Sequence, residues 1–315
     1  MKRIVITALL TVAVAFACSA QKVRYMPAWT PQAQFAGYYM ALEKGFYAKE
    51  GLDVEIEHVS ASSSKNPLSY LEEGAVDFCT MQFIPAVIAR GGGARLVNVL
   101  QHSQNTALMC VSHEPLKTLE DLSGKKVGRW CSGSAEIADM FCNDFNVKYE
   151  WVYFINNVNL FVSKAIDATL CYSYNEYLSL LFARGTIPES HIIKFSDLGY
   201  NFPEDGLYVN EDYLAANPEI VSKFVKATIK GWQYAAEHRE ETVDVVMRYV
   251  DAAKIVTNKT FQRLMLDEVL SLQVNGKSGA VDFSKVDIET FTIITDNLMN
   301  MGVLDSQVDY NTFIR

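Results

Sequence analysis

The amino-acid sequence predicts an α/β fold built from two lobes, and three observations support this. Apolar runs of strand length alternate with segments of helical periodicity over the first two-thirds of the chain, a pattern typical of helices layered on a largely parallel sheet. The chain has 315 residues, enough for two domains with a core in each. A Gly turn and a new buried strand at residues 121–128 restart the alternation as a second domain would.

The N-terminal residues 1–20 have the pattern of an export signal. Lys2 and Arg3 form a charged start, and residues 4–17 form an apolar run too short to span a bilayer comfortably. Two endings remain open. Cys18 follows small residues and fits a lipoprotein in which it is lipidated, whereas cleavage after Ala20 gives a soluble exported protein. We therefore expect a periplasmic or cell-envelope location, with no later transmembrane helix.

Residues 22–58 have the pattern of a strand–helix–strand unit. A short strand runs into a loop that contains Trp29, a helix follows, and a Gly-punctuated turn leads to a second strand. Apolar side chains recur at helical spacing in the helix, while charged side chains occupy its other face. Ligands of open α/β sheets bind beyond the carboxyl ends of the strands, so the Trp29 loop is a candidate ligand contact.

The same patterns extend along the chain, and its last third has almost no strand signal. The predicted strands cover residues 22–26, 53–59, 76–80, 95–101, 107–112, 126–129, 149–153, 168–172, 192–195 and 206–209. The predicted helices cover residues 34–49, 65–73, 83–91, 118–121, 134–145, 157–164, 175–184, 211–216, 218–237, 239–250, 258–272, 284–298 and 309–313.

Composition and motifs argue against several classes of function. The net charge of −9, with no Lys/Arg cluster, argues against nucleic acid as a partner. The cysteines after Cys18 have no metal-ligand spacing, and we expect buried free thiols, with a Cys131–Cys142 bridge as the open alternative. The sequence lacks GxSxG, HExxH, P-loop and helix-opening GxGxxG motifs. We therefore expect no catalytic residue, metal or cofactor.

Two stretches resemble a known family. WTPQAQFAGYYMALEKGFYAKEGLDVEI, residues 29–56, is similar to the first unit of periplasmic solute-binding proteins of ABC importers. The similarity is greatest to the branch related to fungal thiamine-pyrimidine synthases and to bacterial pyrimidine-precursor, riboflavin and sulfonate binders. DLSGKKVG, residues 121–128, resembles the family's DLKGKKVG at the start of its second lobe.

The resemblance implies the two-lobed type II periplasmic binding protein fold. This fold has two mixed, mostly parallel sheets flanked by helices, with a ligand cleft between them. Carried onto this sequence, lobe one comprises residues 22–107 plus 204–315, and lobe two comprises residues 108–203. The chain then crosses the hinge twice.

The resemblance also distinguishes a binding protein from a pyrimidine synthase. The fungal synthases carry a histidine in the helix-opening loop after the third strand, whereas residues 80–85 here contain none. Those enzymes also carry a cysteine-rich run before the return strand, and residues 198–203 contain no cysteine. We therefore expect a binding protein and not an enzyme.

Candidate ligand contacts cluster at strand ends. Tyr172 and Tyr174 close a buried strand two residues apart and therefore face the same way. Glu176 follows and could accept hydrogen bonds from a pyrimidine, as the family's Glu or Asp near this point implies; a helix-capping role is the alternative. The small residues after Trp130 could bind an anion or a carbonyl oxygen, or supply only a helix cap. The full set is Trp29, Gln34, Tyr38, Ser62, Gln82, Trp130, Ser132, Gly133, Ser134, Asn157, Tyr172, Tyr174, Glu176 and Asp205.

The resemblance implies a monomeric substrate-binding component of an ABC importer that captures a small aromatic heterocycle by hinge closure. The expected ligand is a thiamine pyrimidine precursor of the formylaminopyrimidine or hydroxymethylpyrimidine type. The expected protein partner is an inner-membrane ABC permease, and only a lipid anchor would tie the chain to the membrane. A riboflavin or sulfonate binder, or a pyrimidine-synthesising enzyme of the same fold, remains the alternative.

Overall fold

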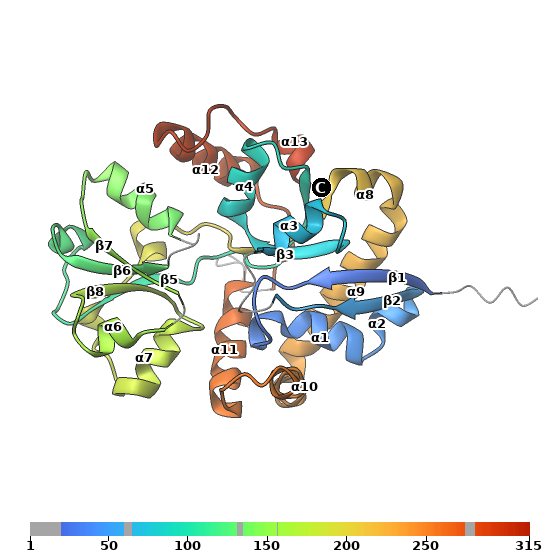
Figure 1. Cartoon of the computed structure of the whole chain (residues 1–315), viewed down its shortest axis with the longest axis horizontal. Coiled ribbons are helices and arrows are strands. Elements are labelled where there is room, and N and C mark those ends of the chain that lie inside the picture. Colours follow the sequence, from blue (N-terminus) through green and yellow to red (C-terminus); the bar gives the residue numbers. More distant parts are fainter. Residues whose placement is uncertain (1–19, 60–64, 131–134, 156, 275–280) are drawn as a thin grey trace, which may run out of the picture.

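The computed structural model describes residues 20–59, 65–130, 135–155, 157–274 and 281–315, and its strands form two five-stranded sheets (Figure 1). We call each sheet with its helices a lobe. The first sheet contains β1 (Gln21–Met26), β2 (Leu52–Ile56), β3 (Phe78–Gln82), β4 (Leu96–Gln101) and β10 (Asp205–Asn210). The second contains β5 (Leu108–Ser112), β6 (Lys126–Trp130), β7 (Glu150–Phe154), β8 (Ala168–Tyr172) and β9 (Ile192–Lys194).

Both sheets are mixed, as predicted. The strand orders are β2-β1-β3-β10-β4 and β7-β6-β8-β5-β9. In the first sheet β1 runs parallel to β2 and β3, whereas β10 runs antiparallel to β3 and β4. In the second sheet β6 runs parallel to β7 and β8, whereas β5 runs antiparallel to β8 and β9. Four of the five strands in each sheet run in the same direction, so both sheets are mostly parallel, as predicted. The exceptions, β10 and β5, each enter a sheet just after the chain has crossed between the lobes.

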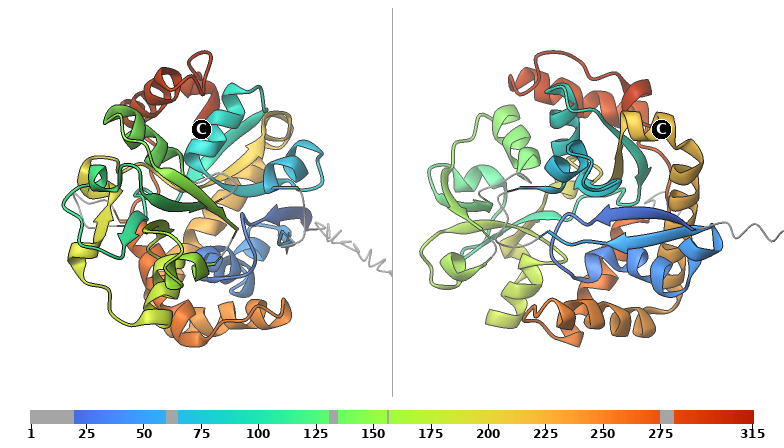
Figure 2. Two further views of the ribbon diagram at one scale, coloured as in Figure 1. Left: turned by 60° about the vertical axis from the view of Figure 1, so that its left-hand side comes forward. Right: turned by 45° about the vertical axis from the view of Figure 1, so that its right-hand side comes forward.

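Helices cover both faces of each sheet, and the C-terminal helices α10 to α13 flank both faces of the first sheet (Figure 2). The helices of the first lobe are η1 (Ala33–Phe35), α1 (Ala36–Glu43), α2 (Phe46–Lys49), α3 (Pro67–Glu72), α4 (Phe83–Gly91), α8 (Glu211–Ala216), α9 (Pro218–Glu237), α10 (Arg239–Ala252), α11 (Lys259–Leu272), α12 (Ile288–Asn300) and α13 (Tyr310–Phe313). Those of the second lobe are η2 (Leu119–Leu122), α5 (Glu136–Asp144), α6 (Asn159–Val162), α7 (Glu176–Arg184), η3 (Glu189–His191) and η4 (Phe195–Leu198).

The predicted single helix over residues 34–49 is wrong. The segment begins with the 3-10 turn η1, continues as α1 and breaks before α2. Gly45 lies at the break with a φ of 67°, in the left-handed region that glycine adopts at little cost. The break lets the chain turn toward β2. Apolar periodicity carries no information on this kink, because it continues on both sides.

Helices α1 and α9 pack unusually close in the first lobe. A Cβ on Gly231 would lie 2.0 Å from the carbonyl oxygen of Gly37, and a Cβ on Gly37 would lie 2.1 Å from the Trp232 ring. Only glycine fits at either position. Trp232 is fully buried beneath this crossing and stacks on His102 with ring centroids 5.3 Å apart. Helix α1 is therefore fixed firmly to the C-terminal helix α9.

Two connecting segments, residues 103–107 and 199–204, join the lobes and lie side by side. The backbone N–H of Ser103 donates to the carbonyl oxygen of Asp205 at 3.1 Å, and that of Glu204 donates to Ser103 at 3.2 Å. The Glu204 carboxylate accepts from the Thr106 hydroxyl and the Ala107 N–H, both at 2.7 Å. The buried Glu204 side chain thus ties the returning segment to the start of the second lobe.

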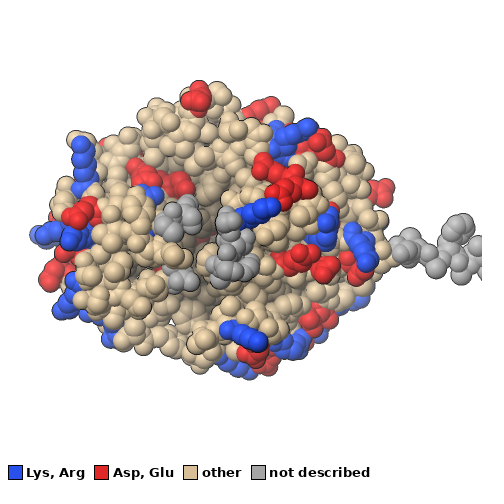
Figure 3. Space-filling view, viewed as in Figure 1, with Lys and Arg blue, Asp and Glu red and all other residues tan. Residues whose placement is uncertain are grey.

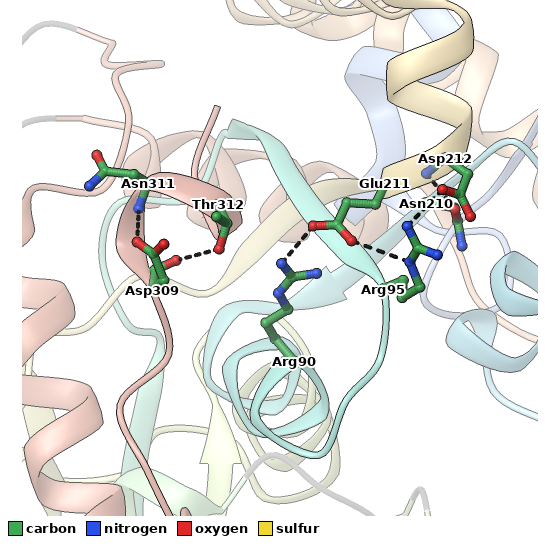
Figure 4. Close-up of polar contacts among 8 residues, drawn as sticks. All are labelled: Arg90, Arg95, Asn210, Glu211, Asp212, Asp309, Asn311 and Thr312. Carbon is green, nitrogen blue, oxygen red and sulfur yellow. Dashed lines mark hydrogen bonds and ion pairs between the residues drawn. The ribbon is translucent and has the colours of Figure 1, made fainter.

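An ion-pair group fixes the end of β10 and the start of α8 (Figure 4). Glu211 accepts from Arg90 at 2.7 Å and from Arg95 at 3.3 Å, and Arg95 also donates to Asp212 at 2.7 Å. Arg90 comes from α4, and Arg95 precedes β4. Because these groups are partly exposed, each pair adds little stability. Their geometry nevertheless orients the chain where the C-terminal helical layer begins.

Candidate ligand-binding cleft

A cleft lies between the two sheets, and Figure 3 shows the hollow that separates the two halves of the molecule. The end of β3 meets the end of β8 across it, where Gln82 contacts Tyr172, as expected for ligand sites of open α/β sheets. One pocket within it is lined by residues from both lobes and from the return segment. They are Gln82, Phe83, Ile84, Pro85, Glu136, Ile137, Tyr172, Pro203 and Glu204.

Three aromatic rings form a continuous stack on the second-lobe side. Trp130 ends β6, Tyr172 ends β8, and Tyr174 follows two residues later. The Trp130 and Tyr172 ring centroids are 4.8 Å apart and inclined by 22°. Those of Tyr172 and Tyr174 are 5.3 Å apart and nearly parallel. The two tyrosines face the same way, as their spacing predicted.

Glu176, the first residue of α7, holds this stack in place. Its carboxylate accepts from the Trp130 indole N–H at 3.0 Å, from the Tyr172 backbone N–H at 3.1 Å and from the Asn175 amide at 3.2 Å. Glu176 is 5% exposed. Burial raises the pKa of Glu176, and these hydrogen bonds oppose the rise. The carboxylate that sequence analysis assigned to the ligand therefore has protein partners that fix the neighbouring rings.

The first lobe contributes amides that reach across the cleft. The Gln82 side-chain amide donates to the Tyr172 hydroxyl at 2.7 Å. The Gln34 amide donates to the Tyr174 hydroxyl at 3.4 Å and to the Asp205 carboxylate at 2.5 Å. Gln82 ends β3, Gln34 lies in η1, and Asp205 begins β10. These contacts join the lobes directly, so the structure is closed around the aromatic stack.

Two neighbouring carboxylates lie buried where the chain returns to the first lobe. Burial raises the pKa of Asp205 to about 6 and that of Glu204 to about 8. Asp205 Oδ1 and Glu204 Oε2 have no hydrogen-bond partner within the described part of the chain. Asp205 lies beside Gln34 and Tyr174, and Oδ1 is therefore an acceptor that a ligand N–H group could satisfy.

The other predicted ligand contacts are more scattered. Trp29 is 37% exposed in the loop after β1, whereas Tyr38 is fully buried in the first-lobe core and stacks on Tyr25 at 4.2 Å. Asn157 is exposed, and its side chain accepts from the Asn159 backbone N–H at the start of α6. The remaining predicted positions lie outside the described residues: Ser62, Ser132, Gly133, Ser134 and the lipidation site Cys18.

Two residues near the cleft are absent from the contacts that the sequence predicts. Glu204 was overlooked, although two adjacent acids before a Gly-containing strand are an unusual signal. His58 is absent from the predicted contacts, yet its ring contacts both Trp29 and Tyr39. No local motif identifies His58, because its partners are 29 and 19 residues away in the chain.

Several features bear on other classes of function. In the described ranges, no helix is long and apolar enough to cross a bilayer. Within the same ranges, no three His, Cys, Asp or Glu side chains are grouped as a metal site. Cys79, Cys110, Cys142 and Cys171 are free thiols. The alternative bridge to Cys142 involves Cys131, which lies outside the described residues.

Comparison with known proteins gives the following similarities. The family model described as NMT1/THI5 like matches residues 32–242. The riboflavin-binding protein RibY of Chloroflexus aurantiacus is 26% identical over 298 residues, which cover 92% of this chain and 83% of that protein. The formylaminopyrimidine-binding protein of Halalkalibacterium halodurans is 26% identical over 245 residues, 74% of this chain and 72% of that protein.

Solved structures share the fold. The periplasmic aliphatic sulphonate binding protein SsuA from Escherichia coli superposes with a TM-score of 0.68 at 16% identity. The match covers 94% of this chain and 92% of that one. The two-lobed fold is thus that of periplasmic binding proteins.

Proposed function

The chain belongs to the NMT1/THI5-like family, and we propose that it is the solute-binding component of an ABC importer. Its ligand is a small aromatic heterocycle, namely a thiamine pyrimidine precursor of the formylaminopyrimidine or hydroxymethylpyrimidine type. The similarity to a formylaminopyrimidine-binding protein supports this ligand class. Residues 1–20 would direct export, with either Cys18 as a lipid anchor or cleavage after Ala20, and an inner-membrane permease would receive the ligand.

The observation that carries the proposal is the pairing of an aromatic stack with polar groups across one cleft. The second lobe supplies the stack of aromatic rings formed by Trp130, Tyr172 and Tyr174. Gln34 and Asp205 offer a donor and an acceptor from the first. A planar heterocycle with ring nitrogens and an amino group needs this combination, because its faces stack while its edge forms hydrogen bonds.

Hinge closure would couple ligand binding to recognition by the permease. The contacts of Gln82 with Tyr172 and of Gln34 with Tyr174 form only when the lobes are close. A ligand that contacts both lobes adds to these bonds and shifts the population toward the closed form. The Glu204 contact between the connecting segments marks where the hinge would bend.

Riboflavin is the second candidate ligand, because the similarity to the riboflavin-binding protein extends over more of the chain. A sulfonate is disfavoured because Arg129, the cationic side chain beside Trp130, is already paired. Both terminal nitrogens of Arg129 donate to Asp139, at 2.7 and 3.0 Å, so this guanidinium already has an anionic partner. Direct contact between the cleft walls also favours a one-ring ligand over the three-ring flavin.

Pyrimidine synthesis is disfavoured for this chain. Residues 80–85 span the end of β3 and the start of α4, the place where the fungal synthases carry their histidine. Gln82 occupies this junction and donates to Tyr172. Residues 198–203, where those enzymes are cysteine-rich, contain Tyr200 and Phe202.

Isothermal titration of the purified protein with formylaminopyrimidine, hydroxymethylpyrimidine, thiamine, riboflavin and taurine tests the proposal. We expect micromolar or tighter binding of a pyrimidine, and at least tenfold weaker binding by Tyr172→Ala. If only riboflavin binds, the pyrimidine assignment is wrong and riboflavin, the second candidate, is the ligand. If taurine alone binds, the heterocycle assignment is wrong.

A further inference from the structure

The two ligand loops of the first lobe are joined by one histidine ring. His58 lies in the segment after β2, and Trp29 lies in the loop after β1. His58 Nδ1 is 2.9 Å from the carbonyl oxygen of Trp29, and His58 Nε2 is 2.9 Å from the Tyr39 hydroxyl. Because β1 and β2 are parallel neighbours, both loops leave the sheet at its ligand-binding edge.

These partners fix the protonation of the ring. A carbonyl oxygen only accepts, so His58 Nδ1 carries the proton and donates to Trp29. Burial lowers the pKa of His58 to about 4, so the ring is neutral near pH 7 and Nε2 accepts from the Tyr39 hydroxyl. The tautomer protonated at Nδ1 therefore satisfies both hydrogen bonds, and each bond keeps the ring oriented for the other bond.

The far end of this chain of contacts is rigid. Tyr39 is fully buried in α1, and its ring stacks on Tyr249 of α10 with centroids 4.2 Å apart. The His58 ring also packs near Phe35, at 6.0 Å between centroids. The Trp29 loop is thus connected through His58 to the packed helical layer of the first lobe.

The Trp29 loop itself depends on such an anchor. Pro27 and Pro31 flank Trp29, and neither has a backbone N–H to donate. The carbonyl oxygen of Trp29 is held by His58, whereas 37% of the residue is exposed to solvent. The backbone is therefore fixed while the indole is accessible to a ligand.

We propose that His58 is a positioning residue for Trp29, which keeps the indole at the mouth of the cleft where it can stack on a bound aromatic ring. The part of this inference that concerns ligand stacking rests on the proposed binding function. The structural part, control of the Trp29 loop by His58, is testable without any ligand.

Fluorine NMR of the ligand-free protein labelled with 5-fluorotryptophan tests the structural part. The chain has four tryptophans, and Trp29→Phe assigns the Trp29 signal. We expect His58→Leu to shift or broaden the Trp29 signal and to leave the Trp151 and Trp232 signals unchanged. His58→Asn can place an amide N–H near the position of Nδ1 and should restore most of the wild-type signal.

A matched control comes from His238, at the junction of α9 and α10. Its ring stacks on Tyr234, with centroids 3.8 Å apart, and like His58 it bonds to a backbone carbonyl, at 3.1 Å. His238→Leu should leave the Trp29 signal unchanged. If His58→Leu does not fold, Tyr39→Phe removes only the hydroxyl and should shift the Trp29 signal in the same direction. An unchanged Trp29 signal in the folded His58 or Tyr39 variant would overturn the inference.

Titration with the compound that binds in the calorimetry described above then tests whether His58 contributes to ligand binding. His58→Leu should weaken binding about tenfold and His58→Asn less than threefold, as expected for losing and keeping one hydrogen bond that orders the loop. A shifted Trp29 signal with unchanged affinity would overturn the link to binding. If no tested ligand binds, only the proposed function fails, because the NMR result stands without it.

Discussion

The two lobes share one strand order but present different chemistry to the cleft. In each sheet the first three strands of the order are parallel to one another. The fourth strand, which the chain enters just after crossing between the lobes, is antiparallel to them, and a fifth strand completes the order. β1 and β3 thus correspond to β6 and β8, and the ends of β3 and β8 face one another. The shared topology places the cleft, and the residues at the strand ends determine what it can bind.

The difference lies in those end residues. The first lobe supplies the amides of Gln34 and Gln82 and the carboxylate of Asp205. The second lobe supplies the rings of Trp130 and Tyr172, and it uses its own carboxylate, Glu176, to hold them. Under the proposed function, the first lobe would bind the polar edge of a heterocycle and the second lobe would stack on its face.

Acid should destabilise the first lobe more than the second, and this is the largest effect that we predict. His102 is buried in the first lobe between Trp232 and Tyr38, and burial lowers its pKa from 6.5 to about 3. The unfolded chain therefore binds a proton at His102 that the folded chain does not, and stability falls as pH decreases from 6.5 toward 3. At pH 4 the loss is on the order of 3 kcal/mol.

Urea unfolding of wild type and His102→Phe at pH 7 and pH 4 measures this loss. The phenyl ring can stack on Trp232 but cannot take up a proton, so the variant should lose about 3 kcal/mol less stability between the two pH values. The difference between the two proteins isolates His102 from the buried acids. Equal losses in both proteins would show that His102 is not the acid-sensitive group.

Removal of the Glu176 carboxylate should affect the second lobe next most strongly. Glu176→Ala leaves the Trp130 indole N–H and the Tyr172 N–H without their acceptor, at a cost of roughly 2 to 3 kcal/mol in unfolding free energy. Glu176→Gln keeps one acceptor oxygen and should cost about half as much. Chemical denaturation checks both, and a loss below about 0.5 kcal/mol for the alanine variant would contradict the role in holding the stack.

Asp205→Asn tests whether the first lobe forms hydrogen bonds with the polar edge of the ligand. The substitution preserves shape and an acceptor for Gln34, but it removes the charge and replaces one acceptor oxygen by a donor. We expect about tenfold weaker binding of an aminopyrimidine in calorimetry. Asp197→Asn, at an exposed position, is the control. Unchanged affinity in Asp205→Asn would exclude Asp205 as a ligand contact.

The smallest effect concerns the contact between the lobes. Gln82→Leu removes the 2.7 Å bond to the Tyr172 hydroxyl and should weaken the closed form by about 1 kcal/mol. Small-angle scattering of the ligand-free protein should then show a larger radius of gyration, and ligand affinity should fall a few-fold. A radius of gyration identical to wild type would indicate that this bond does not favour closure.

Much of the fold was predictable because strand–helix alternation is a local property. The patterns around β1, β6 and β8 identified the strands near the cleft, and the spacing of Tyr172 and Tyr174 predicted their common face. The insertion of β10 beside β3 was not predictable from local pattern, because the two strands pair across more than 120 residues of chain. The break at Gly45 was missed because apolar spacing continues on both sides of it.

The site was less predictable than the fold. Residue type at a strand end indicated that Glu176 and Gln82 could matter, but it could not show that Glu176 faces the Trp130 indole. The partners of His58 and the burial of Tyr38 depend on how helices pack, and no sequence spacing records that. Side-chain roles therefore required the tertiary contacts, whereas the location of the cleft did not.

The position of β10 also sets the order in which the sheets can be completed. The second sheet has all its strands once residue 194 has emerged, whereas the first lacks the strand between β3 and β4 until residue 210. In a chain that emerges N-terminus first, β3 and β4 remain as open edges throughout that interval, and such edges are prone to wrong pairing. A chaperone that binds this chain as it emerges would find its main binding segment in the first lobe, the half that begins first and finishes last.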